Sequence, residues 1–227
     1  MAAKDKEPGT KTVLKPGTIC EFMATLGESS DRECFQLSEV LCTKQEVDNL
    51  MKAGEEMKDM VKIDFSFNGL ADVTALKDLA RLTRLNLSNN KIKNMSCFAI
   101  EESFPNLKWL DISNNKFNEW PAFRSPKLDF LNISGNKLEK VNDQWAGSAS
   151  LRIIAANDNK FKNLAVFKNC PKLEELYLVA NMIAQLTGWE GTLPALRLLN
   201  LRKNKISTFD EEMPELPELT YLNLRKN

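Results

Sequence analysis

The residue types that most often carry enzyme chemistry are absent from this sequence or poorly spaced for it. Histidine is missing altogether, which removes the commonest general base and the commonest zinc ligand. The cysteines are scattered and include no C-x-x-C pair of the kind that metal sites and redox motifs use. We therefore expect reduced thiols, no bound metal and no cofactor. The cysteines are Cys20, Cys34, Cys42, Cys97 and Cys170.

Carboxylates and glycines give no stronger signal for catalysis. Asp210, Glu211 and Glu212 are consecutive, but a run of charges between apolar segments is normally a solvated loop. The sequence contains no nucleophile elbow and no phosphate-binding glycine loop. We predict that the chain is not an enzyme, has no catalytic residues and takes no small-molecule substrate.

The charges are numerous but balanced, with 31 Lys plus Arg against 31 Asp plus Glu. A neutral chain has no general attraction for nucleic acid or an anionic membrane. No run approaches the roughly 18 apolar residues that span a bilayer, and the first residues lack the apolar stretch of a secretory signal. We expect a cytoplasmic protein with no nucleic-acid partner and no direct membrane contact.

The elements that would position any site follow from one repeated pattern, L-x-x-L-x-L-x-x-N-x-L. It occurs eight times, for example as LTRLNLSNNKI ending at Ile92 and LRLLNLRKNKI ending at Ile206. A period of 21 to 25 residues with this consensus is typical of leucine-rich-repeat solenoids. The sequence therefore predicts the α/β class: a curved right-handed coil with a parallel concave sheet, and short helices or 3₁₀ turns and loops on the convex side.

One asparagine in each unit is expected to have a structural role. Its amide can donate to carbonyls of a neighbouring turn while its oxygen accepts from its own backbone. Ligand binding is the alternative, but these asparagines recur in every unit and are expected to point inward. The predicted structural ladder is Asn68, Asn90, Asn115, Asn136, Asn159, Asn181, Asn204 and Asn227.

The composition divides the chain into three parts. Residues 1–17 are charged and contain two prolines, which indicates a mobile N-terminal tail or arm. Residues 18–59 are expected to form an N-terminal cap, with a degenerate first strand in FQLSEVLC (35–42) and a helix or helical turn over 44–60. Residues 60–227 carry the repeats, of which the last is incomplete. We expect either a truncated chain or a C-terminal end that a partner covers.

The residues that flank the buried pair of each strand are expected to project from the concave sheet. Trp109, Phe130 and Ile153 follow one another in one column and predict an apolar strip that anchors a partner. The alternative is that they pack on each other and on the N-terminal arm. Leu198 with Tyr177 and Tyr221 forms a second, weaker group.

A cluster of cations is the other candidate for partner binding. Arg202, Lys203, Arg225 and Lys226 repeat the phrase L-N-L-R-K-N on adjacent units. An acidic segment of a partner could dock there. The alternatives are simple solvation, or pairing with nearby acids at Glu211, Glu212, Glu215 and Glu218.

The phrases LTRLNLSNNKI, LEELYLVANMI and LRLLNLRKNKI resemble the short-period class of intracellular leucine-rich repeats. The order of features over roughly residues 35 to 227 is similar to a leucine-rich-repeat family of the ciliary radial spoke. That resemblance implies a non-catalytic scaffold in the axoneme of a cilium or flagellum, bound to other spoke proteins. The alternative function is a regulatory subunit that grips a protein phosphatase catalytic subunit through its concave face, using Asp64, Asp111, Trp109 and Tyr177.

Overall fold

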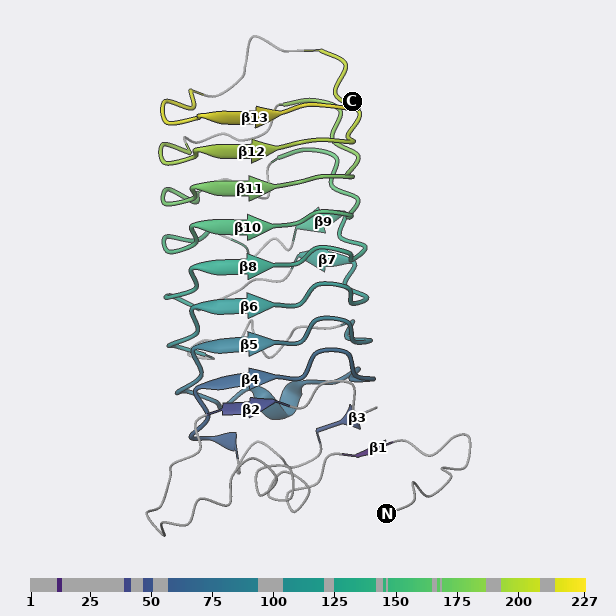
Figure 1. Ribbon diagram of the computed structural model, residues 1–227, viewed down its shortest axis with the longest axis vertical. Coiled ribbons are helices and arrows are strands. Elements are labelled where there is room, and N and C mark those ends of the chain that lie inside the picture. Colours follow the sequence, from purple (N-terminus) through teal and green to yellow (C-terminus); the bar gives the residue numbers. More distant parts are fainter. Residues whose placement is uncertain are drawn as a thin grey trace.

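The computed structural model describes residues 12–13, 39–41, 47–50, 57–93, 104–120, 125–141, 145, 147–164, 167, 169–186, 193–208 and 215–227. Their main feature is one sheet of nine parallel strands, stacked turn on turn (Figure 1). Spatial order follows sequence order, so each repeat places its strand beside the strand of the preceding repeat. This is the leucine-rich-repeat solenoid that the repeat predicts. The strands are β2 (Glu39–Leu41), β4 (Lys62–Asp64), β5 (Arg84–Asn86), β6 (Trp109–Asp111), β8 (Phe130–Asn132), β10 (Ile153–Ala155), β11 (Glu175–Tyr177), β12 (Leu198–Asn200) and β13 (Tyr221–Asn223).

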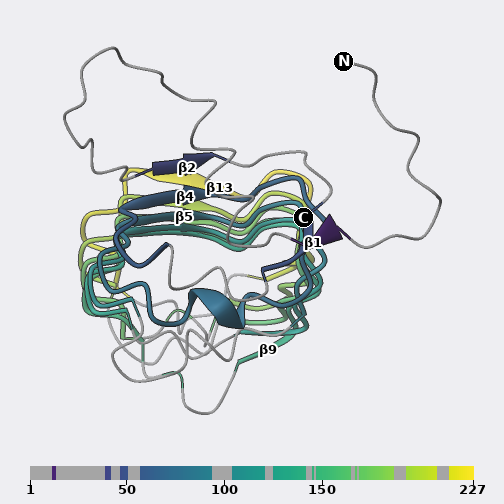
Figure 2. The ribbon, with the colours of Figure 1, turned by 90° about the horizontal axis from the view of Figure 1, so that it is seen from below.

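The alternation of side chains along each strand separates the core from the solvent. From β4 to β12 the central residue is buried, whereas its two neighbours are at least partly exposed. The sheet therefore forms one side of the coil and the return segments form the other (Figure 2). We call the solvent-exposed side of this sheet the sheet face.

The described parts of the return segments hold a few short regular elements. A single turn of 3₁₀ helix, η1 (Thr74–Leu76), follows Asp72, whose carboxylate accepts a hydrogen bond from the Thr74 N–H at 2.8 Å. This agrees with the short helix or 3₁₀ turn expected in a return segment of about a dozen residues. Two short strands, β7 (Glu119–Trp120) and β9 (Lys140–Val141), pair in parallel away from the main sheet.

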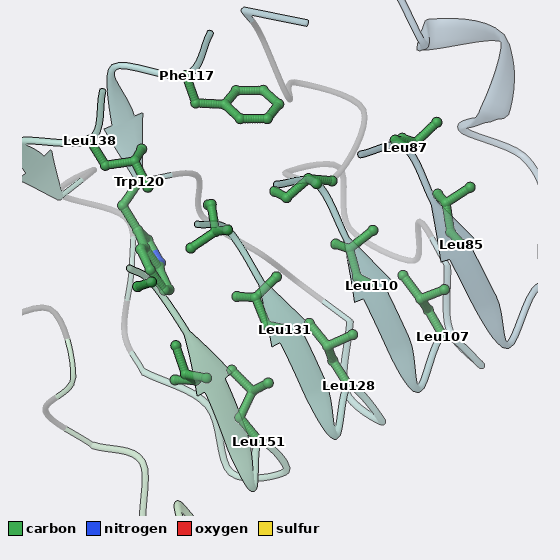
Figure 3. Close-up of a cluster of buried hydrophobic side chains, with 14 of the residues drawn as sticks. Leu85, Leu87, Leu107, Leu110, Phe117, Trp120, Leu128, Leu131, Leu138 and Leu151 are labelled. Atoms are coloured by element: carbon green, nitrogen blue, oxygen red, sulfur yellow. The ribbon is translucent and has the colours of Figure 1, made fainter. Parts of the chain in front are cut away.

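The core is a stack of leucine layers with one aromatic cluster set into it. Leu85, Leu110 and Leu131 lie at equivalent places on successive strands, and all are fully buried (Figure 3). Burying each such side chain contributes roughly 1.5 to 3 kcal/mol. Trp120 packs edge-to-face against Trp145 and Phe167, with ring centroids 5.5 Å and 5.8 Å apart.

The asparagine ladder joins each turn to the one before it. The Asn90 amide donates to the carbonyls of Phe65 and Leu87 at 2.9 Å and 3.0 Å, and its oxygen accepts the N–H of Leu70 at 3.0 Å. Equivalent bonds recur at every later ladder asparagine as far as Asn227. The six from Asn90 to Asn204 are buried. They satisfy backbone groups that would otherwise be buried without partners.

One detail of the predicted ladder is wrong. The asparagine oxygen accepts from the preceding turn rather than from its own backbone, because Leu70 lies 20 residues before Asn90. Both ends of each amide therefore contribute to holding neighbouring turns together. The amide also bonds to its own turn, as Asn90 does to Leu87.

The residue before each ladder asparagine has a left-handed backbone conformation. The φ angles at these positions run from 52° to 66° and include Phe67, Gly135 and Ala180. This conformation turns the chain so that the asparagine side chain points inward. Glycine adopts this conformation readily, whereas for a residue with a Cβ atom the conformation has an unfavourable free energy.

The N-terminal part departs from the sequence-based expectation in one place. The helix expected over 44–60 is wrong at Val47–Asn49, which form β3 and pair in parallel with β1 (Thr12–Val13). Asp48 and Asn49 are weak helix formers, and the pairing gives the backbone other hydrogen-bond partners. β2 lies within 35–42, where a first strand is expected. The division into arm, cap and repeats otherwise stays a prediction, because most of residues 1–56 lie outside the described residues.

Candidate protein-binding surface

The sheet face carries two columns of side chains whose alignment is fixed by strand register. Each strand pairs with its neighbours without a shift, so Arg84, Trp109 and Phe130 lie directly beside one another. Ile153 follows on β10, and the column continues through Glu175 and Leu198. The structure therefore brings together the three apolar residues that the sequence places in one column.

The centre of this column is an aromatic stack. The rings of Trp109 and Phe130 are parallel to within 4°, with centroids 5.1 Å apart. The Arg84 guanidinium carbon lies 3.9 Å from the centroid of the Trp109 ring, within the range of a cation–π contact. Trp109, Phe130 and Ile153 are all partly exposed. We call Trp109, Phe130 and Ile153 the apolar strip; Arg84 lies at its end, over the Trp109 ring.

The alternative role for these residues is packing on each other and on the N-terminal arm. The ring stack shows the first part of that alternative. Of the arm, the structure describes Thr12–Val13, which pair with β3 and not with a strand of the main sheet, so packing of the arm on the apolar strip is not tested. Since packing leaves the rings partly exposed, it also holds them ready for a partner at little entropic cost.

The second column is formed by the third residue of each strand, such as Asp64, Asn86 and Asp111. Most of its side chains are polar, and several form hydrogen bonds with one another. Asn86 donates to Asp64 at 2.9 Å, and Asn132 donates to Asp111 at 3.0 Å. The Asp111 carboxylate also accepts the backbone N–H of Ser113 at 2.9 Å. These side chains terminate their strands in tight local turns. The carboxylates of Asp64 and Asp111 therefore accept hydrogen bonds within the fold and are also partly exposed on the sheet face.

The second apolar group is less compact than the first. Leu198 and Tyr221 are neighbours in the first column, but Tyr177 belongs to the second column and pairs with Asn200. The Tyr177 hydroxyl donates to Glu175 at 2.7 Å, and this bond raises the pKa of Tyr177 to about 12. Glu175 thus lies beside Ile153 of the apolar strip and accepts the hydrogen bond of Tyr177.

The four cations Arg202, Lys203, Arg225 and Lys226 lie at the ends of the last two strands. The Lys203 N–H donates to the Arg225 carbonyl at 2.9 Å, which places the two pairs on adjacent turns. All four side chains are exposed. Within the described part of the chain, which includes Glu215 and Glu218, they form no ion pair. Glu211 and Glu212 lie outside the described residues.

Two charged features of the surface are absent from the sequence-based expectations. The first is a chain of alternating charge at the start of the strands, where Arg152 binds Asp129 at 2.9 Å and approaches Glu174 at 3.7 Å. The hydrogen bond from Arg152 lowers the pKa of Asp129. The second is a set of lysines, each directly after a ladder asparagine. Both features could have been predicted from the sequence, because comparison of equivalent positions in successive repeats, which identified the apolar strip, also aligns these charged residues.

The described residues offer little to catalysis. Among them no group of three or more Cys, Asp or Glu side chains is placed to hold a metal ion. Cys170 is buried, and burial raises the pKa of its thiol, which makes it a poor nucleophile. The other four cysteines lie outside the described residues. No helix in the described part is long and apolar enough to cross a membrane.

Comparison with known proteins agrees with the observed coil. A leucine-rich-repeat family model matches residues 80–138. Tubulin-folding cofactor E of Arabidopsis thaliana is 32% identical over 119 residues, which cover 47% of this chain and 22% of that protein. Toll-like receptor 2 type-2 of Gallus gallus is 28% identical over 178 residues, covering 71% of this chain and 21% of the receptor. The chain spans about a fifth of the length of these two relatives.

Solved structures show the same fold. The chain superposes on the protein of the TLR13–ssRNA13 complex with a TM-score of 0.71 and 22% identity, covering 82% of this chain and 28% of that one. The functional domain of InlJ from Listeria monocytogenes gives a TM-score of 0.57 at 20% identity, covering 82% of this chain and 43% of that one. These likenesses concern the fold alone.

Proposed function

We propose that this leucine-rich-repeat protein is a non-catalytic scaffold that holds a protein partner on its apolar strip. Leucine-rich repeats are in general protein-interaction modules, with a surface built from the variable positions of each repeat. The observation that carries the proposal is the stack of Trp109 on Phe130, capped by Arg84, on a sheet face that is otherwise mostly polar. Aromatic residues and arginine are the side chains most often found at binding hot spots.

The rigid backbone beneath the strip supports this role. Trp109 and Phe130 project from strands whose central residues, Leu110 and Leu131, are fully buried. A partner that covers the rings therefore gains contact area without first ordering the loops or strands of the solenoid. Such preorganisation lowers the entropic cost of association.

The more specific part of the proposal is that the protein is a component of the ciliary radial spoke. It rests on the resemblance of residues 35 to 227 to leucine-rich repeat-containing protein 23, and it implies an axonemal location within a large complex of spoke proteins. The likeness to a tubulin-folding cofactor over 119 residues supports a partner from the cytoskeleton. The alternative, grip on a phosphatase catalytic subunit, has less support because Asp64 and Asp111 already accept hydrogen bonds within the fold.

The test is capture of partners from ciliated cells by the wild-type chain and by a double variant, Trp109→Ser with Phe130→Ser. We expect the double variant to lose capture while its circular-dichroism melt stays cooperative and falls only by the loss of the ring stack and the Arg84 contact, because both rings lie on the surface of an intact core. A control, Lys127→Ser with Lys172→Ser, changes two exposed residues that lie just before β8 and β11, outside the apolar strip, and should retain capture.

Three results would contradict the proposal. A collapsed melt in the double variant would show that the strip is structural. Capture that survives loss of both rings would place the binding surface elsewhere. Recovery of a phosphatase catalytic subunit without axonemal proteins would end the spoke assignment and favour the alternative.

A further inference from the structure

The residues that directly follow the six ladder asparagines from Asn90 to Asn204 form an exposed column. The N–H of Lys91 donates to the Leu70 carbonyl at 2.8 Å, and the equivalent N–H of each later turn donates to the turn before it in the same way. These side chains therefore project from equivalent backbone positions on successive turns. All are exposed. We call them the lysine column: Lys91, Lys116, Lys137, Lys160, Met182 and Lys205.

The lysine column lies at a different place from the apolar strip. The strip projects from the sheet, whereas the column runs along the edge just beyond the C-terminal ends of the strands. This is the edge where the C-terminus, itself a ladder asparagine, is marked in Figures 1 and 2. A partner on the column would not need to contact Trp109 or Phe130.

The column concentrates positive charge although the chain as a whole is neutral. Its five lysines form no ion pair with any residue in the described part of the chain. Neighbouring turns are about 5 Å apart, less than the Debye length of about 8 Å at physiological salt, so their potentials add. Three acids lie within three residues of a column member in the sequence: Glu139 is paired with Lys162 at 2.6 Å, and Glu119 and Asp158 are exposed.

The basic edge continues beyond the column. Lys203 and Lys226 each precede a ladder asparagine, and Arg202 and Arg225 precede them in turn. All four cations are exposed beside Lys205 or on the next turn. The cluster that the sequence singles out is therefore the C-terminal part of a longer surface.

We propose that the lysine column binds an extended, Asp- and Glu-rich protein segment that runs across the turns. From Lys91 to Lys205 there are five turn-to-turn steps, or roughly 25 Å at the strand spacing. An extended chain covers this length with about seven or eight residues. Flexible lysine side chains can then reach successive carboxylates, and the exposed Met182 offers one apolar contact within the column.

The composition of the column favours a peptide over a nucleic acid. Proteins that hold single strands interleave their cations with aromatic side chains on which bases stack. The column contains five lysines and one methionine and no aromatic residue.

The test measures binding of a fluorescent octaglutamate peptide by anisotropy, in low and in physiological salt. We expect saturable binding that weakens as salt rises. The variant Lys116→Glu with Lys137→Glu should weaken it by about tenfold or more at low salt, since it reverses two adjacent charges within one Debye length. The control Lys77→Glu with Lys172→Glu makes the same change in net charge away from the column, and should change affinity by less than about threefold.

Further variants separate this site from the apolar strip and from folding defects. Trp109→Ser with Phe130→Ser should bind the acidic peptide as the wild type does, so failure of either proposal leaves the other standing. If the charge-reversal variant melts early, Lys116→Gln with Lys137→Gln replaces it, with half the change in charge. The proposal is overturned if the wild type does not bind, if both charge-reversal pairs lose affinity equally, or if oligothymidylate of equal charge binds as tightly as the peptide.

Discussion

The ladder asparagines and the first column of the sheet face lie only a few residues apart in every repeat, yet the first is constant and the second is variable. The ladder position is asparagine in all eight units, from Asn68 to Asn227. The first column changes at almost every step, from Lys62 and Arg84 through Trp109 to Glu175. The invariant position is the one whose side chain bonds neighbouring turns, and the variable positions are exposed on the sheet face, where the proposed partner would bind.

The largest expected effect tests the uniform side of this comparison. Replacing Asn136 or Asn159 with Ala removes buried hydrogen bonds to two turns, and should lower the free energy of unfolding by about 1 to 3 kcal/mol. Urea denaturation measures this change. Asn227→Ala is the control, because Asn227 is exposed and should lose much less. Partner capture by folded Asn136→Ala should be unchanged; unchanged stability would count against the ladder.

A smaller effect is expected on the variable side. Arg84→Ala removes the cation above the Trp109 ring, and should cost about 0.5 to 1 kcal/mol of stability, the range of exposed cation–π contacts. If the apolar strip binds a partner, the same change should weaken capture by more than the stability loss accounts for. Isothermal titration with the captured partner, alongside a thermal melt, compares the two. Arg197→Ala, an exposed arginine just outside the column, is the matched control.

The smallest effect concerns the alternating charges at the start of the strands. The Arg152 hydrogen bond lowers the pKa of Asp129 in the folded state. The pair therefore contributes stability above the unfolded-state pKa, near 3.9, and loses it as pH falls through the lower folded value. Asp129→Asn should reduce the difference in melting temperature between neutral and acidic pH, by a small amount because the pair is solvated. An unchanged pH profile would show that this pair is as neutral for stability as an ordinary surface residue.

The sequence predicted the features that repeat and missed those that interrupt the repeat. Strand register, buried leucines and ladder positions all follow from the consensus, because a period of 21 to 25 residues allows few other ways to bury its apolar side chains. The repeat places Trp109 and Phe130 in one column and so predicts that they are neighbours. It does not encode the near-parallel orientation of their rings or the contact of Arg84 with Trp109. Trp120 and Trp145 were not foreseen as core residues, since they lie in return segments that share no pattern. The strand at Val47–Asn49 depends on a distant pairing with Thr12–Val13, which local propensity does not encode.

The left-handed residue before each ladder asparagine has a consequence for how such arrays change. Seven of these eight positions hold a non-glycine residue, and only Gly135 avoids the conformational penalty. The seven are Phe67, Asn89, Asn114, Asp158, Ala180, Lys203 and Lys226. Side chains of very different size thus occupy one backbone shape, because the bonds around it come from the main chain and the neighbouring asparagine. The chemistry of the exposed corner therefore differs from turn to turn while the backbone keeps one conformation, except that at Gly135 an added Cβ would meet the Asn114 side chain.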